Sequence, residues 1–278
     1  VGDDRRIRSS PLARRLARDR ELSLFDVHGS GPDGAIRARD LPTAPAPVTR
    51  PGPAPSTRAE RMRSIIAERM TRSNREIPHY RLERTVEIDA LQRHLAAINE
   101  DRPVAARIVP AAAFVRAVAR AAARHGDLNG TWIDGRFRHG DSVNVSVAIS
   151  LRTGGLVTPT IADADRLSLE ETMELLREFT TAARAGTLRS EWVRDDSTIT
   201  VTNLGERGAD LVHGLISPPE VALVGFGRIL ERPWVVDGAV VPRPLVNVTL
   251  GADHRATDGA VGSRFLATLA RYLEEPET

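Results

Sequence analysis

The sequence predicts a mixed α+β protein, in which helices pack on a mixed β-sheet and a small all-α module precedes this domain. Helical and strand-like hydrophobic periods follow one another without the strict β-α-β alternation of a doubly wound fold. The stretch over residues 42–57 is rich in proline and alanine and is typical of an extended linker. We therefore expect a module over residues 5–41, this linker, and a larger domain over residues 58–276.

The module is expected to start with a helix. In "SSPLARRLARDREL", either Ser9 or Ser10 is the predicted N-cap, with Pro11 in the first turn. The side chains that we expect to face inward are Leu12, Leu16 and Ala13. The following "VHGSGPDGAIRARDL" predicts a loop that leads into a second short helix.

Three arginines gather on the outer face of that first predicted helix. Arg14 and Arg18 lie one helical turn apart, and Arg15 lies beside them. Spacing alone leaves two interpretations open: an ordinary solvated basic face, or a docking surface for an acidic partner.

The larger domain is predicted to alternate helices and strands along its whole length. Hydrophobic periodicity indicates helices over residues 58–77, the second half of 78–100, 109–126, 168–186 and from Gly259 onward. Strands are predicted over the first half of 78–100 and over 142–150, 154–161, 197–205, 220–229 and 233–253. Because helices and strands mix in this way, a mixed sheet covered by helices is the expected architecture.

Composition excludes several kinds of chemistry. The chain of 278 residues contains no cysteine, and all 39 of its basic residues are arginine, which reflects either skewed codon usage or a use of bidentate arginine contacts. Disulfides, thiolate sites and lysine-bound lipoyl or Schiff-base groups are therefore excluded. Histidine spacing predicts no metal site, and no phosphate-binding loop occurs. No apolar run predicts a membrane span, so we expect a cytoplasmic protein with neither membrane nor nucleic acid as partner.

His254 is the strongest candidate for chemistry among the seven histidines. It follows the predicted strand "LVNVTL" and precedes a helix that begins near Asp258 and Gly259, so its imidazole projects from a strand end. Asp258 either caps that helix or holds a charged neighbour in position. His79, in "IPHY", has either a structural or a functional role, and spacing alone leaves His254 either a base or a polar turn residue.

The stretch "DHRATDGA" resembles the DHRxxDGA signature of the dihydrolipoamide acyltransferase (E2) components of 2-oxo acid dehydrogenase complexes, which is related to the HxxxDG motif of chloramphenicol acetyltransferases. The segments "RMRSIIAERM", "IPHYRLERTVEIDAL", "VNVSVAI", "GGLVTPTIADADRLSL", "TITVTNLG" and "SPPEVALVGFGRI" occur in the order of the E2 catalytic domain. Residues 5–41 resemble the peripheral subunit-binding domain that precedes it. The resemblance covers nearly the whole chain outside the linker.

This resemblance implies a chloramphenicol acetyltransferase-like two-layer sandwich and an acyl-CoA-dependent acyltransferase. The acyl group passes from the thioester of dihydrolipoamide to the thiol of coenzyme A, with His254 as general base. Thr202 stands where the family has a serine that stabilises the oxyanion, and it keeps the hydroxyl. Asp258 keeps the site in register through an arginine, either Arg63 or Arg69. In the family the site forms between subunits of a homotrimer, so His254 and Thr202 are expected from neighbouring chains.

For coenzyme binding, the candidate residues are Asn203, Ser150 and Gly227. Asn203 matches a position near the coenzyme in the family, whereas Ser150 replaces a carboxylate that is common there. In the module, Arg14, Arg15 and Arg18 match residues that dock E1 or E3 subunits. A further basic position of the family is Ala35 here.

Two departures from the family leave alternatives open. A lipoyl group must come from a lipoyl domain on another chain or from a missing N-terminal domain, and the ending "YLEEPET" favours a trimer over a cage. The alternative functions are a stand-alone acyltransferase that acts on another carrier or acceptor, and a non-catalytic E3-binding scaffold.

Overall fold

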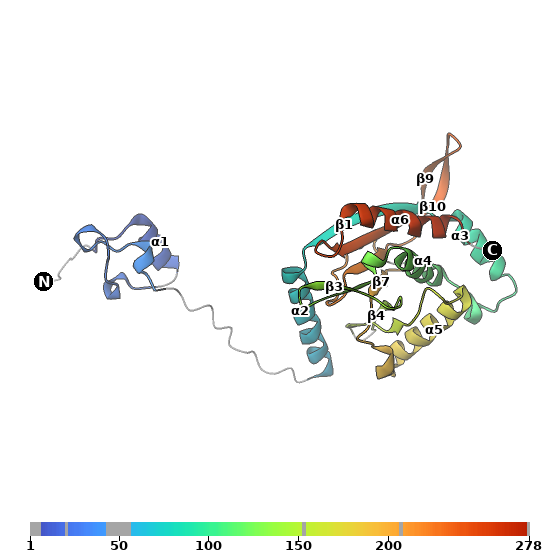
Figure 1. Cartoon of the computed structure of the whole chain (residues 1–278), viewed down its shortest axis with the longest axis horizontal. Helices are drawn as coiled ribbons and strands as arrows, with labels where there is room; N and C mark the ends of the chain where they lie inside the picture. The colour runs from blue at the N-terminus through green and yellow to red at the C-terminus, as the bar shows by residue number, and fades with distance from the viewer. Residues whose placement is uncertain (1–6, 20–21, 43–56, 152–153, 206–207, 277–278) are drawn as a thin grey trace. The chain divides into compact units, whose positions relative to one another are not determined.

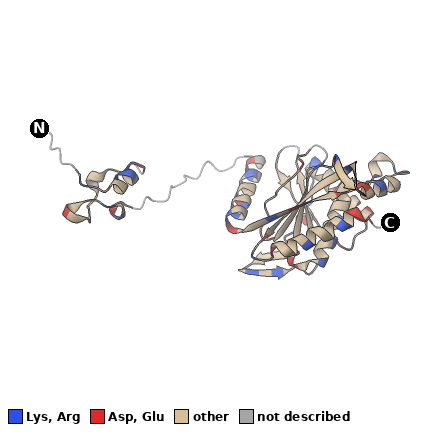
Figure 2. Ribbon diagram, turned by 90° about the horizontal axis from the view of Figure 1, so that it is seen from above, with Lys and Arg blue, Asp and Glu red and all other residues tan. Residues whose placement is uncertain are grey.

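The computed structural model describes residues 7–19, 22–42, 57–151, 154–205 and 208–276. The chain divides into two compact units, Val1–Ala54 and Pro55–Thr278 (Figure 1). Among the described residues, no helix is long and apolar enough to cross a membrane. Figure 2 shows arginines and acidic residues interspersed over the helices of the larger unit.

The N-terminal unit contains the predicted helix, α1 (Pro11–Asp19), capped by Ser10, whose Oγ accepts a hydrogen bond of 3.1 Å from the Ala13 N–H. Ala13 and Ala17 face the small core, whereas the prediction for Leu12 was wrong, since Leu12 is 58% exposed. Alanines at the inner positions let the following chain approach the helix closely, so a larger side chain has no room there.

The predicted second helix of this unit is replaced by short 3-10 turns, η1 (Leu24–Asp26), η2 (Pro32–Gly34) and η3 (Ala38–Asp40). Asp40 ties the loop together by accepting hydrogen bonds from the Ser30 N–H, the Ser30 hydroxyl and the Arg37 N–H. These bonds, the one from the Ser30 hydroxyl first, lower the pKa of Asp40 to about 2. The loop is therefore held by polar contacts rather than by a helix.

The larger unit contains five α-helices among its described residues. They are α2 (Arg58–Glu76), α3 (Asp89–Ile98), α4 (Pro110–Arg124), α5 (Leu169–Ala185) and α6 (Gly259–Glu274). Three 3-10 turns lie between them, η4 (Val104–Ala106), η5 (Gly126–Leu128) and η6 (Ser190–Trp192). The predicted start and end of α5 are confirmed: Ser168 and Glu171 form a capping box, and Gly186 ends the helix with a left-handed φ of 71°.

The predicted mixed sheet is confirmed. It has eight strands in the order β1-β10-β8-β7-β4-β5, with β6 paired to β4 and β9 paired to β10. Strand β7 runs parallel to both β4 and β8, and the other pairs are antiparallel. The bounds are β1 (His79–Glu87), β4 (Val145–Ser150), β5 (Leu156–Val157), β6 (Thr160–Ile161), β7 (Ile199–Asn203), β8 (Ala222–Phe226), β9 (Leu230–Val236) and β10 (Ala239–Asp253).

The two faces of this sheet differ in polarity. Val224, Val248 and Leu250 belong to the main core, in which the rings of Phe114 on α4 and Phe226 on β8 stack with centroids 4.4 Å apart. The opposite face carries alternate residues such as Thr202, Gly225 and Thr249, which lie at the same level in the register. Helices thus cover one face, and the other carries the polar positions.

A separate two-stranded hairpin, β2 (Gly130–Ile133) and β3 (Arg136–His139), was not predicted from the sequence. Its turn is Asp134–Gly135, and both residues have positive φ, 53° and 72°. An Asp-Gly pair between alternating apolar residues is a strong signal of a hairpin, so the signal was present in "TWIDGRFRH".

Candidate active site

The turn that carries His254 is fixed by contacts at nearly every residue. Strand β10 ends at Asp253, which is fully buried, and its carboxylate accepts hydrogen bonds from the side chain of Arg255, the shortest of 2.6 Å from Nη2. The backbone carbonyl of Asp253 accepts from the N–H groups of Ala256 and Thr257. The His254 N–H donates to the carbonyl of Pro78, just before β1, over 3.0 Å. The direction in which the imidazole leaves the sheet is therefore set by the backbone.

The imidazole of His254 is exposed and has one aromatic neighbour, Tyr80 of β1. The two ring centroids are 5.0 Å apart, with an angle of 60° between the planes. A short hydrogen bond joins the Tyr80 hydroxyl to the hydroxyl of Thr257, a residue of the same turn. Burial raises the pKa of Tyr80. Tyr80 thus forms a fixed wall against one side of His254 and leaves the other side open to a substrate.

Asp258 is the N-cap of α6. Its Oδ1 accepts hydrogen bonds of 2.9 Å from the N–H groups of Ala260 and Val261, and the bond from Val261 is the main reason that the pKa of Asp258 is lowered. Electrostatic interactions with Arg264 and His254 lower it further. The structure therefore shows the capping contact of Asp258, and its pairing with Arg63 or Arg69 of α2 stays a prediction.

Arg69 lies close enough to a buried carboxyl group, that of Glu220, for its charge to lower the pKa of that group. This buried glutamate was not predicted from the sequence. Glu220 lies just before β8 and accepts hydrogen bonds from the hydroxyls of Ser197, 2.6 Å, and Thr200, 2.5 Å. Burial raises the pKa of Glu220 to about 7, against the opposing effects of these two hydrogen bonds and of the Arg69 charge. A lone glutamate after two prolines gives no sequence signal of such burial.

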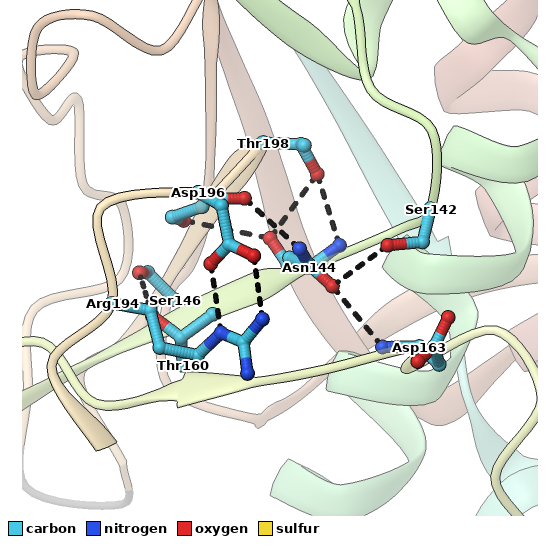
Figure 3. A network of polar contacts seen from close by, with 9 residues as sticks. Ser142, Asn144, Ser146, Thr160, Asp163, Arg194, Asp196 and Thr198 are labelled. Atoms are coloured by element: carbon cyan, nitrogen blue, oxygen red, sulfur yellow. Dashed lines mark hydrogen bonds and ion pairs between the residues drawn. The ribbon is translucent and has the colours of Figure 1, made fainter. Parts of the chain in front are cut away.

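Thr202 is half-buried on β7, and a polar network fixes this strand beside β4 (Figure 3). At its centre, the Asn144 N–H donates to Thr198 Oγ1 over 3.0 Å, and Asn144 Nδ2 donates to the carbonyl of Asp196 over 3.0 Å. Asp196 is in turn paired with Arg194 through two hydrogen bonds, of 2.7 and 2.5 Å. The network sets the parallel register that pairs Thr202 with Ala148.

Within one chain, the structure does not bring Thr202 and His254 together. Thr202 pairs with Gly225 and Gly225 pairs with Thr249, so Thr202 lies level with Thr249. His254 lies five residues further along the chain, from 249 to 254, which is roughly 17 Å at about 3.4 Å per residue. One substrate carbonyl cannot contact both side chains of the same chain.

Two of the three candidate coenzyme residues share a cavity. Asn203 and Gly227 line a cavity of about 210 Å³, whose other lining residues are Val109, Pro110, Ala111, Phe114, Gly205 and Ile229. A Cβ on Gly227 would lie 2.0 Å from the carbonyl oxygen of Asp210, so only glycine fits there. Ser150 is exposed at the end of β4 and does not line this cavity. The contribution of the start of α4 to this cavity was not predicted, because nothing in "VPAAAF" indicates a ligand site.

Comparison with known proteins identifies the family. Residues 53–278 match the family model described as "2-oxoacid dehydrogenases acyltransferase (catalytic domain)", and residues 7–41 match the e3 binding domain. The chain belongs to the 2-oxoacid dehydrogenase acyltransferase family. Among the described residues of this acyltransferase family member, no cluster of histidine and acidic side chains is arranged to hold a metal ion.

Relatives agree with this assignment. The chain is 30% identical to the dihydrolipoyllysine-residue acetyltransferase component of the pyruvate dehydrogenase complex from Zymomonas mobilis, over 98% of this chain and 66% of that protein. For the Rickettsia felis protein of the same name the identity is 32%, over 99% and 68%. The chain thus spans about two thirds of the length of these relatives.

Solved structures confirm the predicted fold. A probable dihydrolipoamide acetyltransferase from Listeria monocytogenes is 29% identical, with a TM-score of 0.72 over 78% of this chain and 94% of that chain. A chloramphenicol acetyltransferase is 15% identical, with a TM-score of 0.51 over 74% of this chain and 94% of that chain, and shares the fold alone. The expected chloramphenicol acetyltransferase-like sandwich is therefore confirmed.

We predict that Arg255→Met destabilises the larger unit, because it leaves the buried carboxylate of Asp253 without its cation. Breaking a fully buried pair costs about 3 to 5 kcal/mol, and since the Arg255 side chain is 32% exposed we expect about 2 to 4 kcal/mol. Urea unfolding of the variant measures this change in the free energy of unfolding. The control Arg271→Met, at an exposed position of α6, should change it by less than about 0.5 kcal/mol. Equal stabilities of the two variants would refute the role given to Arg255.

Proposed function

We propose that this chain transfers an acyl group between the thioester of dihydrolipoamide and the thiol of coenzyme A. The observation that carries the proposal is the exposed imidazole of His254 at the end of β10. Backbone hydrogen bonds and the pairing of Arg255 with Asp253 hold the turn that carries it. Family membership supports the reaction, since the relatives that match over nearly the whole chain are named as acetyltransferases of this type.

The chemistry needs a base and an oxyanion donor. A thiol with a pKa of about 8.5 is mostly protonated at neutral pH, so His254 takes the proton of the coenzyme A thiol as the sulfur attacks the thioester carbonyl. The hydroxyl of Thr202 donates a hydrogen bond to the oxyanion of the tetrahedral intermediate. Collapse of this intermediate breaks the bond to the dihydrolipoamide sulfur, which takes the proton back from the imidazolium. Acyl-coenzyme A and dihydrolipoamide are the products.

The separation of Thr202 from His254 supports a site shared between neighbouring chains of a homotrimer. Co-expression of His254→Ala chains with Thr202→Val chains tests this arrangement, because a mixed trimer can pair the intact His254 of one chain with the intact Thr202 of another. Random assembly gives such a pairing at about one quarter of the interfaces. Recovery of about a quarter of the activity supports the shared site, and recovery of none contradicts it.

For the coenzyme, we propose the cavity lined by Asn203 and Gly227, with Ser150 at the end of the neighbouring β4. Its mostly apolar lining and single amide side chain suit a pantetheine arm, which has an alkyl and amide backbone.

The lipoyl group is supplied by a lipoyl domain, because no lysine of this chain can carry one. We propose that the protein acts in the cytoplasm. Its subunit-binding domain would be residues 5–41 and its acyltransferase domain residues 58–276.

For the N-terminal unit, we propose docking to an acidic surface of an E1 or E3 subunit. The match to the e3 binding domain supports this role. Arg14, Arg15 and Arg18 are all exposed on α1, and Arg14 Nε is oriented by a hydrogen bond of 2.9 Å to the Ser9 hydroxyl. Among the described residues of this unit, no acidic side chain forms an ion pair with these three arginines, which supports a role in binding a partner.

We predict that the double change Arg14→Ala and Arg18→Ala weakens binding to this partner by about 10- to 100-fold, mainly through slower association, because it removes steering charge. Calorimetric titration with purified E3 and with purified E1, at low and high salt, measures the loss and shows which subunit binds. Arg39→Ala, an exposed change on η3, is the control and should bind normally. Equal affinities of the double variant and the unchanged protein would remove α1 from the interface.

Two other functions make different predictions in one assay. A stand-alone acyltransferase would transfer from acyl-carrier thioesters but not from free acyl-dihydrolipoamide, and an E3-binding scaffold would transfer from neither. Measuring coenzyme A acylation with both donors therefore separates the three proposals. Transfer from acyl-dihydrolipoamide that is lost in His254→Ala supports the first.

A further inference from the structure

A segment without helix or strand, described from Gly208 to Pro219, lies against the polar face of the sheet. The hydroxyl of Thr249 on β10 donates to the carbonyl of Val212 over 2.5 Å, and Asn247 Nδ2 donates to the carbonyl of Asp210 over 3.0 Å. A Cβ on Gly225 would lie 2.8 Å from Val212, which shows how closely the segment approaches β8. We call residues 208–219 the covering segment.

The covering segment occupies the face between the level of Thr202 and the end of β10. Val212 lies over Gly225, which is the register partner of Thr202. Gly214 packs against Leu223 and lies near Gly251, closer to His254 along β10. Any shift of this segment would therefore change the surface of the sheet between the level of Thr202 and the end of β10.

One buried joint fixes the end of this segment. Ile216 is fully buried with Ile77 and Leu223, and its carbonyl accepts a hydrogen bond of 2.6 Å from the buried hydroxyl of Ser73 on α2. Its N–H donates to Nε2 of His79 over 3.1 Å. Both backbone groups of Ile216 are therefore bound by side chains from a different part of the chain.

The two partners of His79 determine its protonation state. A backbone N–H can only donate, so Nε2 must be an unprotonated acceptor toward Ile216. The other ring nitrogen, Nδ1, lies 2.9 Å from the carbonyl of Ile77, which can only accept, so Nδ1 carries the proton. Only the neutral imidazole with hydrogen on Nδ1 satisfies both contacts. A protonated His79 would place a second N–H against the N–H of Ile216.

His79 also lies at the end of the sheet that carries His254. It is the register partner of Asp253, and its neighbours in sequence are Pro78, which accepts from the His254 N–H, and Tyr80, which packs on the His254 ring. The joint therefore connects the covering segment directly to the backbone that orients the candidate base.

We propose that His79 is a positioning residue, whose neutral imidazole holds the covering segment against the sheet beside His254 and whose protonation releases that segment. His79 does not contact the reacting atoms. Its effect on turnover rests on the function proposed above, whereas the release of the segment does not.

The surroundings of His79 favour the neutral form. Burial lowers the pKa of His79, the hydrogen bond to Ile77 opposes this effect, the charge of Arg81 on β1 lowers the pKa, and the charge of Asp253 on β10 raises it. Asp253 is paired with Arg255, on which Glu76 of α2 also acts. Because the folded chain favours neutral His79, its stabilising contribution is complete above about pH 6.5 and is lost as the pH falls through the lower folded pKa.

Hydrogen exchange of the full chain tests the release without any assay of activity. After correction for intrinsic exchange, protection of the Ile216 amide and its neighbours should fall by up to about tenfold between pH 7.5 and pH 5.5, the limit that one histidine with a released-state pKa of about 6.5 can give. In His79→Gln, whose amide oxygen accepts at every pH, the protection should stay constant over this range. A fall of equal size in both proteins, or no fall in the unchanged protein, overturns the proposal.

His213 provides the matched control, because it lies on the same segment and its Nε2 is 3.8 Å from the carboxylate of Glu83. His213→Gln should keep the pH-dependent loss of protection, and disappearance of that loss would assign the effect to His213 instead. For turnover, His79→Gln should keep kcat/KM within about threefold of the unchanged protein at pH 8. Toward pH 5.5 its kcat/KM should fall less steeply than that of the unchanged protein, since one titrating group is removed. If kcat/KM falls equally steeply toward pH 5.5 in both proteins, His79 stabilises the fold and has no effect on turnover.

Discussion

Replacement of His254 with alanine should lower kcat/KM for acyl transfer from dihydrolipoamide to coenzyme A by about 10²- to 10⁴-fold at pH 7.5. This is the range that a positioned general base contributes. The loss should be in kcat rather than KM, because the imidazole acts on a proton that moves in the transition state and adds little to the binding of either substrate. Steady-state kinetics with varied coenzyme A measure both constants.

The fold should survive this change. The side chain of His254 is exposed, and the turn is held by its backbone and by Asp253, Arg255, Thr257 and Asp258. Thermal unfolding and the mass of the assembly should therefore match those of the unchanged protein. His139→Ala, at another exposed histidine, is the control and should keep full activity. Activity within threefold of the unchanged protein in His254→Ala would refute the role of His254.

The contacts around His254 show how far sequence reasoning extends into this site. The motif "DHRATDGA" predicted the strand end, the helix start and the projecting histidine, and these follow from local patterns of cap and glycine. The wall formed by Tyr80 was not predicted, because it depends on the pairing of β1 with β10, residues separated by more than 150 positions. Such long-range pairings leave no local periodicity to detect.

The same distinction explains the errors in the N-terminal unit. The helix α1 follows from a local signal and was predicted, with its cap at either Ser9 or Ser10, and the structure places the cap at Ser10. The exposure of Leu12 and the burial of Ala17 depend on how residues 24–41 pack on the helix. In this small unit the helix contributes Ala13 and Ala17 to the core, and Ile36 and Leu41 pack beside them, so hydrophobicity alone gave the wrong orientation for Leu12.

The buried polar groups of the larger unit could not be predicted from the sequence either. The partners of Glu220 lie 20 and 23 residues away in the sequence and the partner of Ser73 lies 143 residues away, and a single glutamate or serine is usually exposed. His79 was left open between two roles because its two partners, Ile77 and Ile216, are backbone groups. Backbone partners cannot be identified from residue types.

Thr202→Val should lower kcat by about 10²- to 10³-fold, the cost of removing one oxyanion donor, while KM for coenzyme A changes little. Valine has the same shape as threonine, so the half-buried position on β7 remains filled and the network around Asn144 and Thr198 remains intact. Thr202→Ser keeps the hydroxyl and removes only the methyl group, so kcat should stay within about threefold of that of the unchanged protein. Together, these variants separate the hydroxyl from the volume of the side chain.

The control is Thr85→Val, which removes an exposed hydroxyl on β1 that donates to Asn247, and it should leave kcat unchanged. If Thr202→Ser loses activity and Thr202→Val keeps it, the methyl group rather than the hydroxyl matters, and the oxyanion donor must be sought elsewhere. If only valine is inactive, Thr202 performs the role that the resemblance gives to a serine. Because Thr202 on β7 lies level with Thr249, and Thr249 is roughly 17 Å before His254 along the chain, that result also requires the hydroxyl to serve the histidine of a neighbouring chain.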